Sequence, residues 1–251
     1  MAYSKLQDFV KSKQPYTALF YCSTGVGKTT TAGLIAEKSK GKTLILDVDR
    51  TIATSLGKGE VVKDISRIDI KQISNATKRV EKETGKVLEK GTWDDWEETL
   101  MELATMKKNG KLDYENIVVD NISELERCIL SDLGSQGKNK GVPAQADYQY
   151  MQFKLVNSLR FMKSLGVNVI WTAWENYENY THPDGTQYTR SYPKISAKIV
   201  DNICGLCDFV GKIVAKQDGS RGIILEATQN VYAKNQIDSR KGCLAEEFIN
   251  G

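Results

Sequence analysis

Short apolar runs alternate with longer amphipathic stretches along this chain. The apolar runs, bounded by polar or glycine-containing segments, predict strands at Thr17–Cys22, Thr43–Asp49, Asn116–Asp120, Val167–Thr172, Phe209–Ala215 and Gly222–Thr228. The amphipathic stretches predict helices at Lys28–Ser39, Trp93–Lys107, Ile122–Asp132, Ala146–Ser164 and Ala197–Leu206. Strands that alternate with helices are typical of an α/β fold, with a mostly parallel central sheet and crossover helices.

The last two strands follow a different rule. A polar turn that contains Asp218-Gly219 separates them, which predicts an antiparallel β-hairpin at one edge of the sheet. Two other segments, Gly134–Ala146 and Glu175–Ser196, show neither the helical nor the strand pattern. Long irregular segments are uncommon in a compact domain unless they have a function.

Length and charge set broad limits. The chain has 251 residues, of which 40% are hydrophobic, and this predicts one α/β domain over residues 1–251 with a core at about 15–240. The net charge of +3 permits nucleic-acid binding but does not argue for it. No apolar run is long enough to span a membrane. Residues 1–13 lack the apolar centre of a signal peptide, so we expect a cytoplasmic protein without membrane partners.

Cys204 and Cys207 form a C-x-x-C pair, for which two interpretations exist. One is a redox pair or half of a zinc site, although the remaining thiols are scattered and His182 is the only histidine. The other is a packed helix, because the surrounding apolar residues repeat at helical spacing. The second interpretation is favoured.

The strongest chemical signal is the segment Cys22–Thr30, which follows a predicted strand and opens a predicted helix. Gly25 and Gly27 let successive backbone N–H groups point at phosphate oxygens, and the helix N-terminus adds partial positive charge. Lys28 is expected to reach the β- and γ-phosphates, and Thr29 to place its hydroxyl on Mg²⁺. The predicted contacts to ATP are Ser23, Thr24, Gly25, Val26, Gly27, Lys28, Thr29 and Thr30. One departure from the G-x-x-x-x-G-K-[ST] pattern is Cys22, which stands at the first glycine position.

Acids at strand ends supply the remaining chemistry. Asp120 ends an apolar strand, which we expect to neighbour the strand of the phosphate loop, and it is the predicted metal-shell acid, with Asp113 as the alternative. Asp49 ends the second predicted strand and is the candidate general base for the attacking water. Asp47 lies on the same face two residues earlier. In a non-catalytic interpretation, Asp49 caps the next turn or positions Arg50.

The order of these motifs resembles the RecA-like core, and more narrowly the phage nucleotide-binding proteins associated with single-strand annealing and recombination. The residues that carry this resemblance are Cys22–Thr30, Asp47–Asp49, Trp93–Trp96, Ile117–Asp120, Val169–Glu175 and Ala233–Gln236. The resemblance implies a Mg²⁺-dependent ATPase that acts on single-stranded DNA and is stimulated by it. It also implies self-association into a filament or ring and the host cytoplasm as the location, with a single-strand DNA-binding protein as a candidate partner.

The resemblance also assigns roles to single residues. In the family, the acid at the position of Asp49 is the catalytic carboxylate. The strand after the metal aspartate usually ends in a glutamine that senses the γ-phosphate; this glutamine is missing here, and Thr172 or Glu175 are the substitutes. Lys234, with Arg240 as second choice, matches the cation that reaches the γ-phosphate of a neighbouring subunit.

Two mobile loops hold single-stranded DNA in the family, and the irregular segments match them by order. The residues expected to contact DNA are Lys138, Lys140, Tyr177, Tyr180, Tyr188, Arg190, Tyr192 and Lys194, because aromatic rings stack on bases beside cations that meet phosphates. An alternative remains open for the second segment. Pro183-Asp184-Gly185 is a turn signal, and the flanking tyrosines are then cross-strand pairs of a hairpin.

Two rival functions remain at this point. A nucleoside or nucleotide phosphotransferase usually needs an arginine-rich lid, and the second irregular segment offers only Arg190. A non-catalytic, nucleotide-gated DNA-binding module is the other, since Cys22 and Trp174 depart from the family pattern. The chain has no Asn-Lys-x-Asp guanine motif, which disfavours a GTPase.

Overall fold

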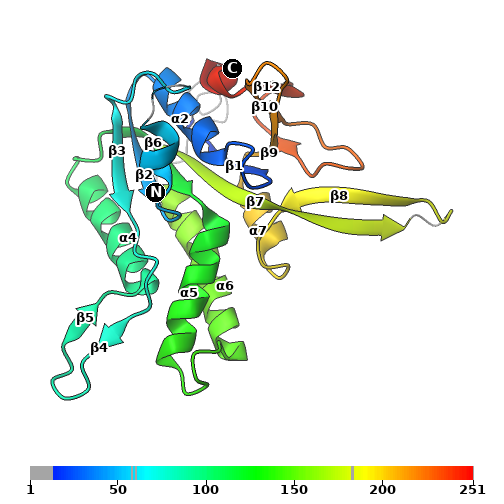
Figure 1. Cartoon of the computed structure of the whole chain (residues 1–251). Coiled ribbons are helices and arrows are strands. Elements are labelled where there is room, and N and C mark those ends of the chain that lie inside the picture. Colours follow the sequence, from blue (N-terminus) through cyan, green and yellow to red (C-terminus); the bar gives the residue numbers. More distant parts are fainter. Residues whose placement is uncertain (1–13, 58, 60, 182–183, 251) are drawn as a thin grey trace, which may run out of the picture.

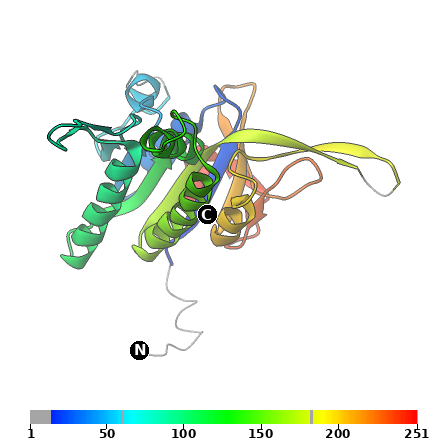
Figure 2. The ribbon, with the colours of Figure 1, turned by 90° about the horizontal axis from the view of Figure 1, so that it is seen from below.

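One large sheet with helices on both faces forms the body of the protein (Figures 1 and 2). The computed structural model describes residues 14–57, 59, 61–181 and 184–250. The strands are β1 (Thr17–Cys22), β2 (Lys42–Asp47), β3 (Ile68–Gln72), β4 (Arg79–Val80), β5 (Val87–Glu89), β6 (Tyr114–Asp120), β7 (Asn168–Thr181), β8 (Gln187–Pro193), β9 (Phe209–Ala215), β10 (Arg221–Ile224), β11 (Lys234–Asn235) and β12 (Gly242–Leu244). The helices are α2 (Lys28–Lys38), α3 (Ile52–Leu56), α4 (Thr92–Lys108), α5 (Ile122–Gln136), α6 (Gln145–Ser164), α7 (Val200–Leu206) and the 3₁₀ helix η1 (Ala245–Asn250).

The sheet order is β12-β10-β9-β1-β7-β6-β2-β3. The six strands from β9 to β3 run parallel, whereas β10 and β12 are antiparallel at one edge. β11 and β8 add to the sides of β9 and β7 in antiparallel fashion. The prediction of a mostly parallel sheet with crossover helices is therefore confirmed, and so is the β9–β10 hairpin. The hairpin is not the outermost element, because β12 pairs beyond it.

Alternation along the central strands divides the buried side chains into two cores. In β1, Leu19 and Tyr21 pack toward α4, α5, α6 and α7, whereas Ala18, Phe20 and Cys22 pack toward α2, α3 and η1. β7 repeats the division, with Trp171 in the first core and Ile170 in the second. Both faces of the central strands are buried, which is why they read in the sequence as unbroken apolar runs.

The boundaries of β1 and β9 agree with the sequence prediction residue by residue, and those of the other four predicted strands differ. β2 ends at Asp47, so Asp49 lies beyond the strand, and β10 ends at Ile224 instead of Thr228. β7 continues to Thr181, nine residues past its predicted end, and pairs there with β8. The segment 175–196, which the sequence pattern left unassigned, is mostly this two-stranded ribbon (Figure 1).

The C-x-x-C pair belongs to a packed helix end. Cys204 lies in α7 and Cys207 follows it, and both thiols are buried and free. Burial raises the pKa of both thiols, to about 12 for Cys204. These protonated thiols support the packed-helix interpretation. His182, the histidine weighed as a metal ligand, and the start of the predicted turn at Pro183 lie outside the described residues, as do residues 1–13.

Membrane insertion finds no support in the part of the chain that the structure describes. No helix there combines the length and the apolar character that are needed to cross a bilayer.

Candidate nucleotide site and the β7–β8 ribbon

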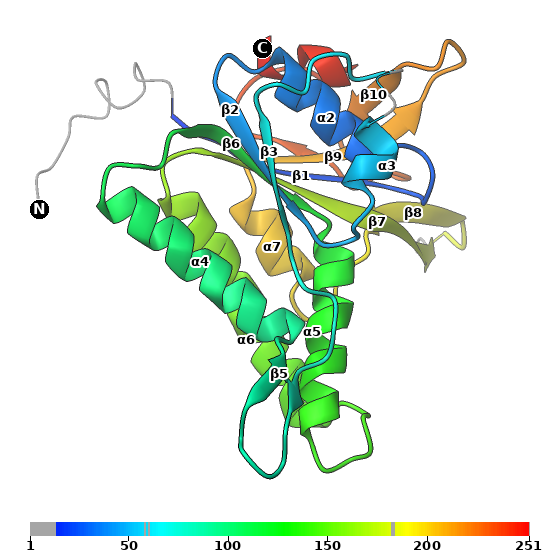
Figure 3. The ribbon, with the colours of Figure 1, turned by 60° about the vertical axis from the view of Figure 1, so that its left-hand side comes forward.

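The phosphate loop lies where β1 ends and α2 begins (Figure 3). Gly25 and Gly27 have φ angles of 85° and 119°, in the left-handed region that favours glycine. Lys28 is the first residue of α2 and is only 7% exposed, while the other predicted ATP contacts are half-buried or exposed. Cys22 is the last residue of β1, and its side chain packs in the core beneath α2. A small apolar residue therefore fits this position.

Asp120 contacts the phosphate loop directly. The Thr29 hydroxyl donates a hydrogen bond to Asp120 Oδ2 over 2.6 Å, and the Thr172 hydroxyl donates to Asp120 Oδ1. The expectation that the Asp120 strand neighbours β1 is wrong, because β7 lies between β1 and β6. The aspartate still reaches the loop, since the three parallel strands point their carboxyl ends the same way and Thr172 of β7 donates to its carboxylate.

The donors at this edge fit a magnesium ion bound together with a nucleotide. Mg²⁺ prefers oxygen ligands and commonly takes one or two carboxylates together with phosphate oxygens and water. Thr29 and Asp120 offer a hydroxyl and a carboxylate at the N-terminus of α2, where phosphates bind. Among the described residues, no group of three or more His, Cys, Asp or Glu side chains is placed to hold a metal. A metal shared with nucleotide phosphates does not need such a group.

Asp49 has the environment of a general base. Asn121 Nδ2 donates to Asp49 Oδ2 over 2.6 Å, whereas Asp49 Oδ1 is buried and has no hydrogen-bond partner in the described chain. Burial, followed by the negative charges of Asp120 and Glu124, raises the pKa of Asp49 to about 7. A carboxyl group that titrates near neutral pH can accept a proton from water under physiological conditions.

The side chain of Asp47 is hydrogen-bonded to the start of the next helix. Its Oδ1 accepts a hydrogen bond from the backbone N–H of Thr51 over 3.3 Å, at the start of α3. The geometry thus favours Asp49 over Asp47 as the base. Sequence analysis missed Asn121, which also caps α5 by accepting from the Glu124 N–H over 2.8 Å. An Asn directly after a strand and before a helix is a recognisable N-cap signal.

Glu175 joins the phosphate loop to the ribbon. The Ser23 hydroxyl donates to Glu175 Oε2, and Lys212 Nζ lies 2.7 Å from Glu175 Oε1. Burial alone would raise the pKa of Glu175, but the hydrogen bonds and charge of Lys212 and Ser23 outweigh it and hold this pKa below the usual value. Lys212, from β9, was missed in the sequence, because no local motif links it to a glutamate on β7.

The β7–β8 ribbon displays its side chains on two faces. By the strand register, Glu178 pairs with Arg190 and Tyr180 with Tyr188, so these four share one face with Tyr192. The rings of Tyr180 and Tyr188 stack with centroids 5.3 Å apart. This pair confirms the alternative interpretation of the segment as a hairpin with cross-strand tyrosines. The guanidinium carbon of Arg190 lies 5.0 Å from the Tyr232 ring centroid. We call the face of the ribbon that carries Glu178, Tyr180, Tyr188, Arg190 and Tyr192 the tyrosine face.

Tyr177 belongs to the opposite face, which is directed toward the phosphate loop. Its hydroxyl lies 3.3 Å from Ser23 Oγ, and Lys212 Nζ is 6.0 Å from its ring centroid. Lys194 follows β8 and places its ammonium 5.7 Å from the Trp174 ring centroid. The predicted DNA contacts of this segment are therefore divided between two surfaces.

Lys138 and Lys140 lie in the connection between α5 and α6, far from the ribbon (Figures 1 and 3). The N-terminal end of α5 touches the ribbon base, where the Ser123 hydroxyl donates to the Lys194 carbonyl over 2.7 Å. Fifteen residues of α5 then carry the chain away over about 22 Å, at roughly 1.5 Å per residue. Within one chain, the two predicted DNA-binding segments do not meet.

Lys234 does not lie at the phosphate loop of its own chain. Its ammonium donates to the carbonyls of Cys204, Gly205 and Cys207 over 3.3, 2.9 and 2.7 Å, at the C-terminal end of α7. Arg240 pairs with Asp238 over 2.7 Å. The action of Lys234 on a neighbouring subunit stays a prediction, and it requires that these three hydrogen bonds be exchanged for others.

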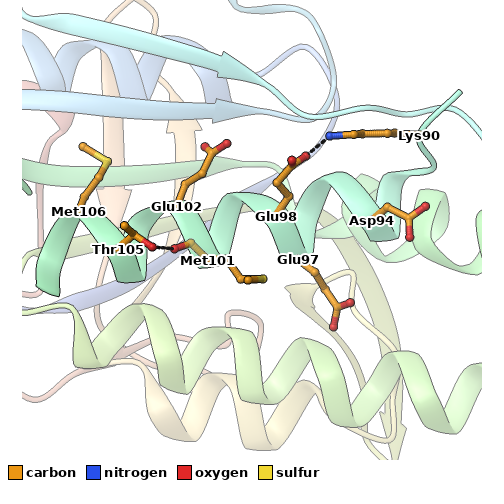
Figure 4. A pocket seen from close by; sticks show the side chains of 8 residues that line it. All are labelled: Lys90, Asp94, Glu97, Glu98, Met101, Glu102, Thr105 and Met106. Carbon is orange, nitrogen blue, oxygen red and sulfur yellow. Dashed lines mark hydrogen bonds and ion pairs between the residues drawn. The ribbon is translucent and has the colours of Figure 1, made fainter. Parts of the chain in front are cut away.

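A hollow of about 830 Å³ lies along α4, between Lys90 and Met106 (Figure 4). Four of its eight lining side chains are acidic, and Figure 4 shows Lys90 paired with Glu98. This acidic surface is unsuited to a polyanion, and the hollow includes no phosphate-loop residue. The nucleotide site is therefore assigned from the contacts at the carboxyl edge of the sheet, not from the size of a surface hollow.

The fold and the site define a P-loop nucleotide-binding domain. A glycine-containing loop joins a strand to a helix, the helix begins with a buried lysine, and an aspartate accepts a hydrogen bond from the threonine after that lysine. A family model described as an AAA domain matches residues 14–237, and the chain belongs to this family. Among curated proteins, none matches the chain.

Two solved structures match the chain at low similarity. An ATP synthase subunit, NeqB, from Nanoarchaeum equitans has a TM-score of 0.49 at 12% identity, over 82% of this chain and 46% of that one. A KaiC-like protein from Pyrococcus horikoshii has a TM-score of 0.44 at 12% identity, over 86% of this chain and 81% of that one. The present chain thus spans less than half the length of the first of these proteins.

Proposed function

We propose that this protein is a Mg²⁺-dependent ATPase that binds single-stranded DNA on its β7–β8 ribbon. The observation that carries the nucleotide part is the 2.6 Å hydrogen bond from Thr29 to Asp120 at the N-terminus of α2. This contact supports the proposal, because it joins a hydroxyl and a carboxylate suited to a magnesium ion beside the glycines and the lysine that would bind a triphosphate. ATP and Mg²⁺ are accordingly the proposed ligands.

Each residue of the nucleotide site has its own role in the proposed reaction. Backbone N–H groups around Gly25 and Gly27 hold phosphate oxygens, and Lys28 neutralises charge that develops on the transferred phosphoryl group. Thr29 and Asp120 would hold a Mg²⁺ ion, which would further neutralise the charge of the phosphates when bound. Asp49 orients a water molecule through Oδ1, which has no partner among the described residues, and accepts the proton as the water attacks.

The tyrosine face is the proposed DNA surface. Tyr180, Tyr188 and Tyr192 offer rings for base stacking, and Arg190 beside them offers a cation for phosphate. Stacking tolerates any base, because every base has a flat aromatic face. The ribbon therefore suits DNA binding with little sequence preference.

The Ser23–Glu175–Lys212 contacts supply a physical connection between the two activities. Ser23 belongs to the phosphate loop, and Glu175 is the residue of β7 from which the ribbon projects. A phosphate that draws the Ser23 hydroxyl or Lys212 toward itself changes the partners of a buried carboxylate. We propose that ATP alters the ribbon by this route and that DNA alters hydrolysis in return.

We place this activity in single-strand annealing or strand exchange, in the cytoplasm of the cell that makes the protein. Several copies assemble on one DNA strand as a filament or ring in this proposal, which brings Lys138, Lys140 and Lys234 into reach of a neighbour's ligands. A single-strand DNA-binding protein is the proposed partner. The support is the resemblance of the motifs to phage recombination proteins.

Product analysis tests the reaction class. Purified protein is incubated with γ-labelled ATP, Mg²⁺, a mixture of nucleosides and single-stranded DNA, and the labelled products are separated by chromatography. Inorganic phosphate is the expected product. A labelled nucleotide would identify a phosphotransferase, and binding of ATP without any labelled product would identify a non-catalytic module.

A further inference from the structure

A second cation approaches the phosphate loop from the side opposite Asp120. Arg221 is the first residue of β10, just after the turn that follows β9. Because β9 runs parallel to β1, this turn lies at the same edge of the sheet as the loop 23–27. β7 and β6 carry Thr172 and Asp120 on the other side of β1.

The strand register directs Arg221 toward α2. Arg221 and Ile223 are two residues apart in β10, so they share a face, and Ile223 packs in the core that α2 covers. An added Cβ on Gly27 would lie 2.5 Å from Arg221 Nε and 3.4 Å from Arg221 Cζ. The guanidinium thus rests against the residue that caps the N-terminus of α2.

This guanidinium has unused hydrogen-bonding capacity. Arg221 Nε is buried and without a hydrogen-bond partner among the described residues, and Nη1 donates to the Gly219 carbonyl of its own turn. No described carboxylate forms an ion pair with Arg221. A buried N–H of a charged group without a partner is costly, and a phosphate oxygen would satisfy it.

We propose that Arg221 binds the α- and β-phosphates of the nucleotide in its own chain. The backbone amides near Gly27 hold these phosphates in a P-loop, while the lysine reaches the β- and γ-phosphates. The planar guanidinium matches the geometry of phosphate oxygens, and the missing side chain of Gly27 allows its approach. The phosphates are then held between Arg221 on one side and the Thr29–Asp120 pair on the other.

This proposal rests on the nucleotide site proposed above and predicts a distinct signature. Arg221 contacts the α- and β-phosphates, which ATP and ADP share. Its removal therefore weakens the binding of both nucleotides equally. We expect Arg221→Ala to lower the affinity for fluorescent ADP and ATP analogues by roughly tenfold. KM for ATP should rise with little change in kcat, because the contact exists before and during the reaction. Arg221→Lys should recover part of the affinity.

The matched control is Lys216→Ala, which removes an exposed cation from the same turn and should leave affinity unchanged. Circular dichroism establishes that each variant is folded. Wild-type affinity for ADP in Arg221→Ala, or a fall in kcat at constant KM, would overturn the proposal for Arg221. If Lys28→Ala also bound ATP as tightly as wild type, the nucleotide site itself would be wrong, so the two failures are distinguishable.

Discussion

The two halves of β7 share one backbone but have opposite surroundings. From Val169 to Ala173 the strand is buried between parallel neighbours, and its Thr172 supports the Asp120 carboxylate. From Tyr177 to Thr181 it leaves the sheet body, pairs only with β8 and exposes most of its side chains. In the inner half, packing between neighbouring strands holds Thr172 in place beside Asp120. The outer half instead exposes its side chains to solvent. Glu175 lies between them and contacts both Ser23 and Lys212.

The largest effect is expected from a change at the phosphate loop, next to the inner half of β7. Lys28→Ala should lower ATP turnover by about a hundredfold or more, because it removes the cation that meets the developing charge. The measurement is phosphate release at saturating Mg²⁺ and ATP. Lys38→Ala, an exposed lysine at the other end of α2, is the control and should keep the wild-type rate; a Lys28→Ala enzyme as fast as this control would remove the P-loop assignment.

Asp49→Asn should lower turnover by roughly a hundredfold, since the amide cannot accept the proton of water. In the wild type, only the ionised Asp49 is active, so the rate should rise as pH passes through the Asp49 pKa of about 7. The variant should lose this rise. Rates measured from pH 5.5 to 8.5 decide the matter, and a wild-type pH profile in Asp49→Asn would assign the base to another residue.

The raised pKa of Asp49 also has a consequence for stability. The folded-state pKa of about 7 lies above the ordinary value of 3.8, so the unfolded chain ionises first. The folded state therefore loses stability as pH rises from about 4 to about 7, and the loss stays constant above that. Asp49→Asn removes this cost. Thermal unfolding should therefore show the variant gaining most over the wild type at pH 8 and least near pH 4; the reverse trend would contradict the burial of this carboxyl.

A smaller effect is expected on the outer half. The double change Tyr180→Ala and Tyr188→Ala should weaken single-stranded DNA binding by roughly tenfold or more, because each stacked base contributes about 1–3 kcal/mol. Turnover without DNA should stay unchanged. Fluorescence anisotropy of a labelled oligonucleotide provides the measurement, and Thr189→Ala on the opposite face is the control. Equal losses in both variants would show that the tyrosine face is not special.

The smallest effect is expected at the junction. Glu175→Gln keeps an acceptor for Ser23 but loses the ion pair with Lys212. We expect DNA to stimulate hydrolysis a few-fold less in this variant, with basal turnover and DNA affinity near wild type. If stimulation were unchanged, the connection between the two halves of β7 would lie elsewhere.

The same contrast explains what could be predicted from the sequence. β1 and β9 were bounded correctly, because strands buried on both faces read as continuous apolar runs between polar segments. The outer half of β7 and all of β8 were not assigned, since a ribbon exposed on both faces has no apolar alternation to reveal it. Its pairing comes from backbone hydrogen bonds and cross-strand contacts such as Tyr180 with Tyr188.

Site residues follow a similar rule. The phosphate loop and Asp120 are marked by local motifs, and the structure brings Thr29 and Asp120 together. Lys212 and Arg221 are not marked, because each approaches the loop from a strand far along the chain. Only the fold places β9 next to β1 and β10 next to β9, so no short motif could identify these two cations.

The most direct test of the central claim is the rate of ATP hydrolysis with and without single-stranded DNA over a range of salt concentrations. A nucleotide site joined to a DNA-binding ribbon predicts stimulation by DNA that declines as salt weakens the phosphate contacts. A basal rate that Lys28→Ala abolishes but that DNA leaves unchanged at every salt concentration would contradict it.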